Sequence, residues 1–346
     1  MCSSDLMAAR PNILLLLTDD QRFDTIGALG NEAISTPAMD RLVRDGVAFS
    51  HACIPCGTVG AVCMPSRAML HTGRTLFHLE HAGAAIPRDH RLLGEELAAR
   101  GWHSYGIGKW HNGHEAYARS FRDGAEIFFG GMEDHWNVPA YSFDPTGRYD
   151  RLAPMVRDPW RSNRTELRRC DHIVPGKHSS ELFADAAVRF LDSWRGEAPF
   201  FLSVAFMAPH DPRTMPRRYL EMYDPAAIRL PESFRERHPF DNGALDIRDE
   251  LLAGPPRDPA EIRRHIAEYY AMISHLDAEI ARILDALERS GRLEDTIVIL
   301  AGDNGLALGK HGLMGKQSCY EHSVRVPLVL RGPGIACGER RDALVY

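Results

Sequence analysis

The chain has 346 residues, enough for one large α/β domain or two domains of ordinary size with a sizeable core. A hydrophobic content of 44% and a charged content of 25% are typical of soluble globular proteins. The net charge is −6, with 41 basic residues outnumbered by 47 acidic ones. This balance argues against nucleic acid as a partner, so any anion-binding site must be local.

The apolar segments and the cysteines also exclude several classes of protein. No apolar run approaches the roughly 20 residues of a membrane-spanning helix, so we expect no membrane partner. Residues 1–9 lack the apolar stretch of a signal peptide, and we expect a leader or artefact there, before a folded domain of residues 10–346. Seven irregularly spaced cysteines do not suggest a disulfide framework. These features favour a cytoplasmic protein, or a periplasmic or secreted one if a leader is missing. They do not indicate an oligomeric state.

Short apolar segments alternate with helical patterns along the chain. We expect buried strands at residues 12–17, 102–108, 199–205, 296–301 and 326–330. We expect helices from Pro37 to Gly46, over 90–100, over 179–194, and from Pro259 to Gly291 with one break. This alternation predicts an α/β fold with a mainly parallel central sheet flanked by helices. Residues 130–175 and 208–257, rich in Pro, Arg and Asp, are predicted insertions that shape a cleft.

Polar clusters follow the first four predicted strands where each strand ends. They are Thr18-Asp19-Asp20, Lys109-Trp110-His111, Pro209-His210-Asp211 and Gly302-Asp303-Asn304-Gly305. Open α/β sheets bind ligands beyond the carboxyl ends of their strands, so we expect these side chains to meet at one edge. One such cluster alone is usually a turn or a helix cap, but four together favour a binding site.

The chemistry of these side chains points to ester hydrolysis. The clusters contain four residues with oxygen donors, Asp19, Asp20, Asp303 and Asn304. Such donors suit a hard divalent cation, Ca²⁺ or Mg²⁺, better than zinc. A cation would relieve the repulsion among the carboxylates. The basic residues that suit a tetrahedral oxyanion are Arg67, Lys109 and Lys316. Two histidines, His111 and His210, can exchange protons near neutral pH. The set predicts hydrolysis of a sulfate or phosphate ester.

A candidate nucleophile lies in the cysteine-rich segment of residues 53–74, CIPCGTVGAVCMPSRAMLHTGR. Pro65 fits the first turn of a helix that ends near Gly73, which places Cys63 at the helix N-terminus, where an anion is favoured. Arg67 lies four residues on, on the same helix face.

The same stretch also contains a C-x₂-C pair, Cys53 and Cys56, with His51 nearby. A zinc site would need two further ligands, and Cys63 supplies one of them. A thioredoxin-like pair should open a helix, whereas glycines follow this pair. We therefore favour two cysteines without a chemical role, and keep the zinc and redox sites as weaker alternatives.

Cys63-x-Pro65-Ser66-Arg67, followed by Leu70-x-Thr72-Gly73, resembles the signature of the type I sulfatases of the alkaline phosphatase superfamily. The resemblance continues in order through residues 11–22, 36–52, 106–113, 208–212, 302–316 and 325–334. In that family the cysteine is oxidised to Cα-formylglycine, whose hydrated aldehyde is the nucleophile. The resemblance thus implies a formylglycine-dependent, arylsulfatase-like hydrolase, an alkaline phosphatase-like fold, and a formylglycine-generating or sulfatase-maturing enzyme as partner.

The resemblance also implies a role for each matching residue. The cation, usually Ca²⁺ with Mg²⁺ as the alternative, would be bound by Asp19, Asp20, Asp303, Asn304 and modified Cys63. Arg67 would hold the formylglycine hydrate, and Lys109 and Lys316 the sulfate oxygens. His210 would protonate the leaving alcohol, while His111 would assist the hydrate or the later elimination. The expected reaction releases sulfate and an alcohol from a sulfate monoester.

Two other functions and several details stay open. The same site suits a phosphonate monoester hydrolase or phosphodiesterase, and an inactive sulfated-glycan-binding protein is a less favoured alternative. The substrate is an aryl, choline or carbohydrate sulfate. Asp134, His135 and Trp136 are candidates for substrate selectivity, and His311 and Glu321 for supporting the site. Sulfatases continue into a smaller C-terminal subdomain after the strand at 326–330, so we expect a catalytic domain that is truncated at its C-terminus.

Overall fold

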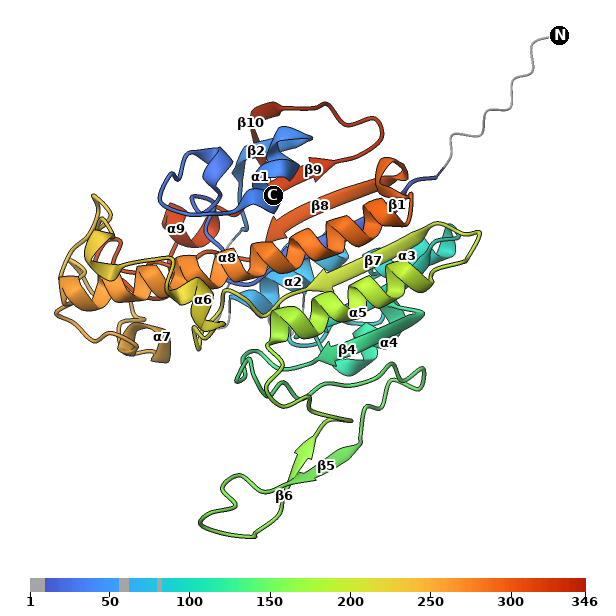
Figure 1. Cartoon of the computed structure of the whole chain (residues 1–346), viewed down its shortest axis with the longest axis horizontal. Coiled ribbons are helices and arrows are strands. Elements are labelled where there is room, and N and C mark those ends of the chain that lie inside the picture. Colours follow the sequence, from blue (N-terminus) through green and yellow to red (C-terminus); the bar gives the residue numbers. More distant parts are fainter. Residues whose placement is uncertain (1–9, 56–61, 80–82) are drawn as a thin grey trace.

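The computed structural model describes residues 10–55, 62–79 and 83–346, and an eight-stranded sheet runs through its centre (Figure 1). The predicted leader and Cys56 lie outside the described residues. The strand order is β10-β2-β9-β8-β1-β7-β3-β4. The strands are β1 (Asn12–Thr18), β2 (Val47–Ala52), β3 (His103–Lys109), β4 (Asp123–Phe128), β7 (Phe200–Ala205), β8 (Thr296–Gly302), β9 (Leu328–Arg331) and β10 (Glu339–Val345).

The sheet is mixed but mostly parallel, which confirms the predicted fold class. Strands β8, β1, β7, β3 and β4 pair in parallel, whereas β9 runs antiparallel to both β8 and β2. All five predicted strands are present within two residues of their expected ends. Strands β2, β4 and β10 were not predicted from the sequence, and neither was the small two-stranded sheet of β5 (Leu152–Met155) and β6 (Glu166–Arg169). In Figure 1 that small sheet extends away from the main body.

Helices cover both faces of the sheet. Those labelled in Figure 1 are α1 (Pro37–Arg44), α2 (Cys63–Thr72), α3 (Leu93–Ala99), α4 (His114–Ser120), α5 (Ser179–Ser193), α6 (Arg217–Leu220), α7 (Arg248–Leu251), α8 (Pro259–Arg289) and α9 (Glu321–Val324). The predicted break in α8 is wrong, because the helix is continuous over 31 residues. Asp258 caps its N-terminus by accepting from the Ala260 N–H, and no glycine or second proline interrupts its sequence.

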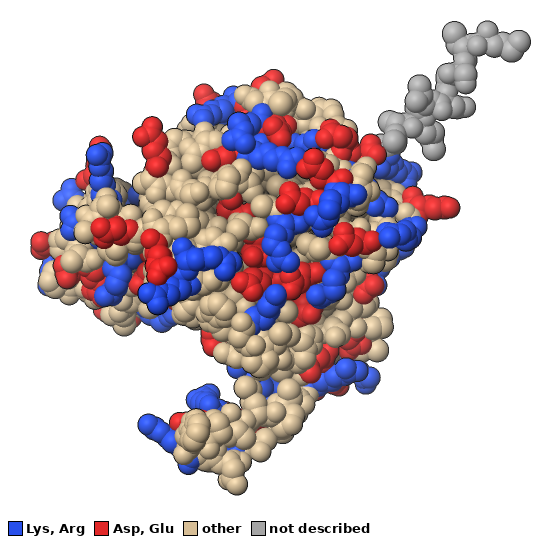
Figure 2. All heavy atoms as spheres, viewed as in Figure 1, with Lys and Arg blue, Asp and Glu red and all other residues tan. Residues whose placement is uncertain are grey.

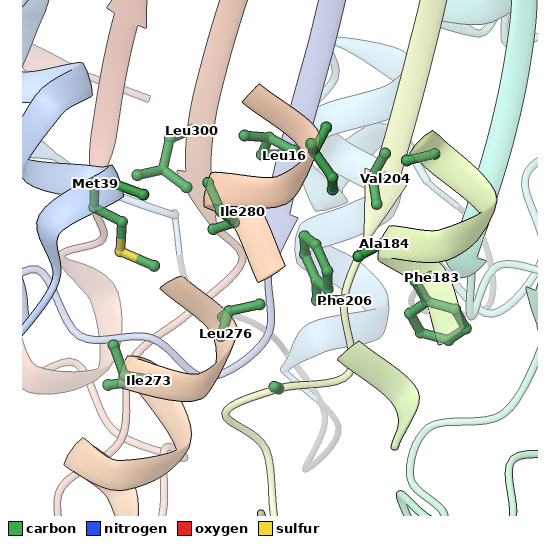
Figure 3. Close-up of a cluster of buried hydrophobic side chains, with 14 of the residues drawn as sticks. Leu16, Met39, Phe183, Ala184, Val204, Phe206, Ile273, Leu276, Ile280 and Leu300 are labelled. Atoms are coloured by element: carbon green, nitrogen blue, oxygen red, sulfur yellow. The ribbon is translucent and has the colours of Figure 1, made fainter. Parts of the chain in front are cut away.

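Residues of β1 show how the two faces of the sheet are buried. Leu14 and Leu16 join the core under α1, α5 and α8, part of which Figure 3 shows, with Leu16 beside Leu276 and Ile280 of α8. Leu15 and Leu17 join a second core on the opposite face. Alternate residues of a strand point to opposite faces, so this uninterrupted apolar run is that of a strand covered on both sides.

The parallel register brings the strand ends to one edge. Thr18 at the end of β1 pairs with Gly302 at the end of β8, so Asp19 and Asp303 follow at the same level. The Asp303 N–H donates to Thr18 O at 3.1 Å, and the Asp19 N–H donates to Ala208 O, after β7, at 3.1 Å. Lys109, the last residue of β3, also contacts Asp19, so four segments far apart in the sequence converge, as the polar clusters predicted.

Surface charge agrees with the balanced composition. On the face shown in Figure 2, basic and acidic side chains are interspersed. Among the described residues, no helix is both long and apolar enough to cross a membrane.

Asp24, in the loop after β1, joins this loop to the segment that follows β8. Its carboxylate accepts from Arg22 Nε and from Lys310 Nζ, each at 2.6 Å. Burial raises the pKa of Asp24, but Arg22 and Lys310 outweigh burial and hold that pKa well below its ordinary value. A carboxylate with a lowered pKa stabilises the folded state above its unfolded pKa of about 4, and this stabilisation is lost as the pH falls further.

We therefore expect Asp24→Asn to lower the free energy of unfolding at pH 7 by about 1–3 kcal/mol. The difference from wild type should shrink below about pH 4, where the unfolded carboxyl is protonated. Urea unfolding at both pH values measures this. Asp45→Asn, which removes an exposed contact with Arg41, should change little at either pH. An Asp24→Asn deficit that is equal at both pH values would contradict the charge-based account.

Candidate active site

Cys63 is the first residue of α2 and is 3% exposed. Pro65 lies in the first turn, and Gly73 ends the helix with a φ of 64°, donating its N–H to Met69 O at 2.8 Å. Both features agree with the predicted helix. The positive end of the helix dipole and the free N–H groups of the first turn favour negative charge near Cys63.

The Cys63 thiol lies among charged side chains from the end of β1 and from the loop after β8. Its Sγ donates to Asp19 Oδ1 at 3.0 Å, lies 3.5 Å from Asp20 Oδ1, and accepts from Lys316 Nζ at 2.9 Å. Burial raises the pKa of the thiol well above its ordinary value, and Asp19 raises it further. The unmodified thiol therefore stays protonated and is a poor nucleophile here.

Asp20 has an unusual backbone conformation that lets two consecutive carboxylates meet. Successive residues of an extended strand point in opposite directions. Asp20 has a φ of 64°, a left-handed conformation that aspartate tolerates better than most residues. Both Asp19 and Asp20 consequently reach the Cys63 sulfur.

Two buried oxygen atoms at this site lack a hydrogen-bond partner among the described residues. They are Asp20 Oδ2 and Asn304 Oδ1. Both are acceptors, and leaving such atoms unsatisfied is costly. His210 Nε2 lies 3.7 Å from Asp20 Oδ2, which is too far for a hydrogen bond.

Ligand atoms of Asp19, Asp20, Cys63 and His210 lie within 4.8 Å of one another, and all four residues are buried. This buried group, together with the free acceptors Asp20 Oδ2 and Asn304 Oδ1, fits a divalent cation. Cys53 and His51 belong to neither of the two potential metal-binding groups found among the described residues, and Cys56 lies outside those residues.

Asp303 lies in the same cluster, where its carboxylate makes two hydrogen bonds. Oδ1 accepts from the Asp20 N–H at 3.0 Å, and Oδ2 accepts from Arg67 Nε at 2.9 Å. Burial raises the pKa of Asp303 to about 7, with Asp19 adding to the effect. Burial also acts on Asp19, but Lys109 and Arg67 outweigh it and hold the pKa of Asp19 well below its ordinary value.

Three buried cations balance these carboxylates. Arg67 donates to Asp303, to Lys109 O at 2.7 Å and to Phe206 O at 3.4 Å. Lys109 Nζ contacts Asp19 Oδ2. Lys316 Nζ donates to Asp20 Oδ1 at 2.6 Å. Burial lowers the pKa of Lys316, but Asp20 and its other anionic neighbours outweigh burial and raise it well above its ordinary value, so Lys316 stays charged.

The two predicted histidines occupy different surroundings. His210 Nδ1 contacts Asp211 O at 2.7 Å, which orients the ring so that Nε2 faces Asp20. His111 has a φ of 71°, and burial followed by Lys109 lowers its pKa to about 3. His111 is therefore neutral at physiological pH. A Cβ on Gly131 would lie 2.8 Å from His111 Nε2, so only glycine leaves room for this ring.

Three further polar residues contact the backbone of the site, and these contacts were not predicted from the sequence. Asn112 Nδ2 donates to Met64 O, in the first turn of α2, at 2.8 Å. Tyr269 of α8 contacts Asp20 O through its hydroxyl. His135 is fully buried, and its Nε2 lies 3.1 Å from His210 O. Asn112 belongs to the matching segment 106–113, and His135 was a candidate for substrate selectivity, but no local pattern marks Tyr269.

The remaining weaker candidates have ordinary structural contacts. His135 is fully buried, and its ring contacts the backbone oxygen of His210. It is therefore not exposed to a substrate, contrary to the expectation. His311 stacks on Tyr320 with ring centroids 4.3 Å apart, and Glu321 pairs with Arg325 at 3.0 Å.

Comparison with known proteins identifies relatives of this chain. The sequence profile of the family described as Sulfatase matches residues 11–345. The chain is 30% identical to the multifunctional alkaline phosphatase superfamily protein PehA of Trinickia caryophylli, over 94% of this chain and 69% of PehA. It is 25% identical to an N-acetylglucosamine-6-O-sulfatase of Bacteroides thetaiotaomicron, over 97% of this chain and 65% of the relative. The chain thus spans about two thirds of the length of these relatives.

The fold is also found in a solved structure. The crystal structure of a phosphonate monoester hydrolase of Agrobacterium radiobacter superimposes with a TM-score of 0.72 at 22% identity, covering 97% of this chain and 71% of the other. The family profile covers nearly the whole described chain, including every residue of the cluster around Cys63. The chain therefore belongs to the sulfatase family of the alkaline phosphatase superfamily.

Proposed function

We propose that this sulfatase-family hydrolase cleaves sulfate monoesters, with Cys63 oxidised to formylglycine as its nucleophile. The observation that carries the proposal is the position of Cys63, at the start of α2 and in contact with Asp19, Asp20 and Lys316. An anion bound there would meet a helix N-terminus and a charged lysine. Hydrated formylglycine would supply a hydroxyl nucleophile that the protonated thiol of Cys63 does not provide.

The protein groups around Cys63 have separable roles in this proposal. A Ca²⁺ or Mg²⁺ ion held by Asp19, Asp20, Asn304 and residue 63 would make the nucleophilic hydroxyl more acidic and offset charge on the sulfate. Asp303, whose Oδ2 accepts from Arg67 and whose Oδ1 accepts from the Asp20 N–H, would be a further oxygen donor for the ion. Lys316 and Lys109 would orient the sulfate oxygens. His111 would assist the formylglycine hydrate or the later elimination.

Burial of Cys63 has a consequence for how the protein matures. At 3% exposure, the thiol is closed to an oxidising enzyme once the domain has folded. We therefore propose that a formylglycine-generating or sulfatase-maturing enzyme acts on the chain before folding. Folded protein made without that enzyme should keep Cys63 as a thiol when exposed to the enzyme later, and intact-mass measurement reports this.

A substrate panel tests the proposed reaction. Protein whose formylglycine content has been verified by mass should hydrolyse an aryl sulfate and a 6-O-sulfated amino sugar; the latter follows from the name of the B. thetaiotaomicron relative. The competing function is phosphonate monoester or phosphodiester hydrolysis, which the phosphonate monoester hydrolase fold favours. Activity on aryl phosphonates alone would overturn the proposal in favour of this second function. Binding of sulfated sugars without turnover would instead favour a glycan-binding protein.

His210 should act as the acid that protonates the leaving alcohol. His210→Ala should lower kcat by about 10²–10⁴-fold for an alkyl sulfate, because a poor leaving group needs that proton. The loss should be smaller for a nitrophenyl sulfate, whose leaving group is stable as an anion. Steady-state kinetics with both esters measures the difference.

His103 offers a matched control, because it begins β3 and so lies at the opposite edge of the sheet. His103→Ala should leave both rates within about two-fold of wild type. An equal loss for both esters in His210→Ala would refute the acid role.

A further inference from the structure

A second group of potential metal ligands lies between α5 and α8, outside the site described above. It consists of Glu181 in the first turn of α5 and of His275 and Glu279 on α8. Residues 275 and 279 are four apart, so they lie on one helix face. Figure 1 shows α5 and α8 running side by side over the same face of the sheet.

His275 is fully buried, and neither ring nitrogen has a hydrogen-bond partner among the described residues. Its Nε2 lies 3.6 Å from Glu181 Oε1 and 3.8 Å from Glu279 Oε1. These distances exceed the hydrogen-bond range of about 2.7–3.2 Å. They are close to the roughly 3.3–3.6 Å between ligand atoms that each lie 2.0–2.2 Å from a tetrahedral zinc ion.

The basic side chains nearby leave one oxygen atom of each glutamate free to bind a cation. Lys177 lies 3.7 Å from Glu181 Oε2, and Arg282 donates to Glu279 Oε2 at 2.5 Å. Both basic groups also contact Asp185, at 2.8 Å and 2.5 Å respectively. In each glutamate the basic group contacts Oε2, while Oε1 faces His275.

Aromatic rings close the remaining side of the group. The centroids of the His178 and Tyr219 rings lie 4.5 Å and 4.9 Å from that of the His275 ring, and the Arg218 guanidinium lies over the Tyr219 ring. A histidine that binds a metal must be a neutral imidazole. A charged imidazolium without hydrogen bonds would be costly at this buried position.

We propose that Glu181, His275 and Glu279 bind a first-row divalent metal of the zinc type, which links α5 to α8. One imidazole and two carboxylates suit Zn²⁺, and the partly exposed Glu181 leaves a path for entry and for water as a further ligand. The site is structural and independent of the proposed ester hydrolysis.

Zinc titration by calorimetry tests the proposal with zinc chloride as the probe. The titrated protein carries Cys63→Ala and His210→Ala, which remove the thiol and imidazole of the first site, and calcium chloride is present throughout. We expect one equivalent of zinc to bind and the melting temperature to rise. Adding His275→Gln should weaken zinc affinity by at least about 10-fold and remove the rise.

Two further variants keep the test decisive. Glu279→Gln should weaken zinc binding as well, and it decides the matter if His275→Gln does not fold. Glu261→Gln is the matched control, because Glu261 also lies four residues from a histidine of α8, His265, whose Nδ1 is 2.5 Å from Arg213. It should bind zinc as the parent does. No zinc binding by the parent, or equal binding by the Glu279→Gln variant, would overturn the proposal.

Discussion

Replacing Cys63 with alanine should abolish ester hydrolysis, with kcat falling by at least about 10⁴-fold. The reason is that the surrounding groups converge on this one atom, since Asp19 Oδ1 and Lys316 Nζ both lie within 3.0 Å of the sulfur. Alanine keeps the helix and its N-terminus but removes the group that is oxidised. The measurement is turnover of an aryl sulfate by protein coexpressed with a formylglycine-generating enzyme.

Cys53→Ala is the control for this experiment. Cys53 is half-buried and lies next to β2, where its backbone bridges Arg325. It should keep normal turnover and normal formylglycine content. Cys63→Ser adds a second comparison, because a serine could take up the sulfuryl group but has no second hydroxyl through which to release it. Sustained turnover by Cys63→Ala would refute the assigned nucleophile.

Replacing Arg67 with alanine should cause the largest loss of stability among the site variants. Arg67 is 1% exposed, and its guanidinium joins Asp303 to two backbone carbonyl oxygens from different strand ends. Removing it leaves a buried carboxylate without its cation, and breaking a buried pair in this way costs about 3–5 kcal/mol. Urea unfolding should show this loss, and turnover should fall with it.

One further variant separates the geometry of Arg67 from its charge, and a surface variant serves as the control. Arg67→Lys keeps the charge, but its compact ammonium lacks the planar guanidinium that spans these three acceptors, so we expect it to recover only part of the stability. Arg41→Ala removes a surface arginine that pairs with Glu288 at 2.9 Å and should cost less than about 1 kcal/mol. If Arg67→Ala costs no more than Arg41→Ala, Arg67 does not hold the strand ends together.

The central strands and the polar segments after them could be predicted because both depend on local pattern. Leu14 to Leu17 are buried on alternate faces of the sheet, and such an uninterrupted apolar run is typical of a strand covered on both sides. Parallel strands end at one edge, so the polar segments that follow them had to meet. The resemblance to the sulfatase family, which begins at the motif around Cys63, predicted that these segments follow one another in the family's order along the chain.

The edge strands could not be predicted, because their sequences carry little of this pattern. Strand β10, ERRDALV, is almost entirely exposed and is a strand only because it pairs with β2. Likewise β9 was expected as a strand, but its antiparallel direction depends on how the chain returns to β8 and β2. The predicted break in α8 was wrong because burial of one continuous helix face outweighs local irregularity.

By itself, the sequence determined the α/β class, the family, and which residues collect at the strand ends, because periodicity and motif spacing are local properties. The tertiary structure alone decided how those residues contact one another. The left-handed φ of Asp20 turns its carboxylate toward Cys63, and Arg67 points to Asp303. The packing of α5 on α8 places Glu181 beside His275. Such contacts join residues up to hundreds of positions apart, and only folding brings them within hydrogen-bonding or metal-binding range.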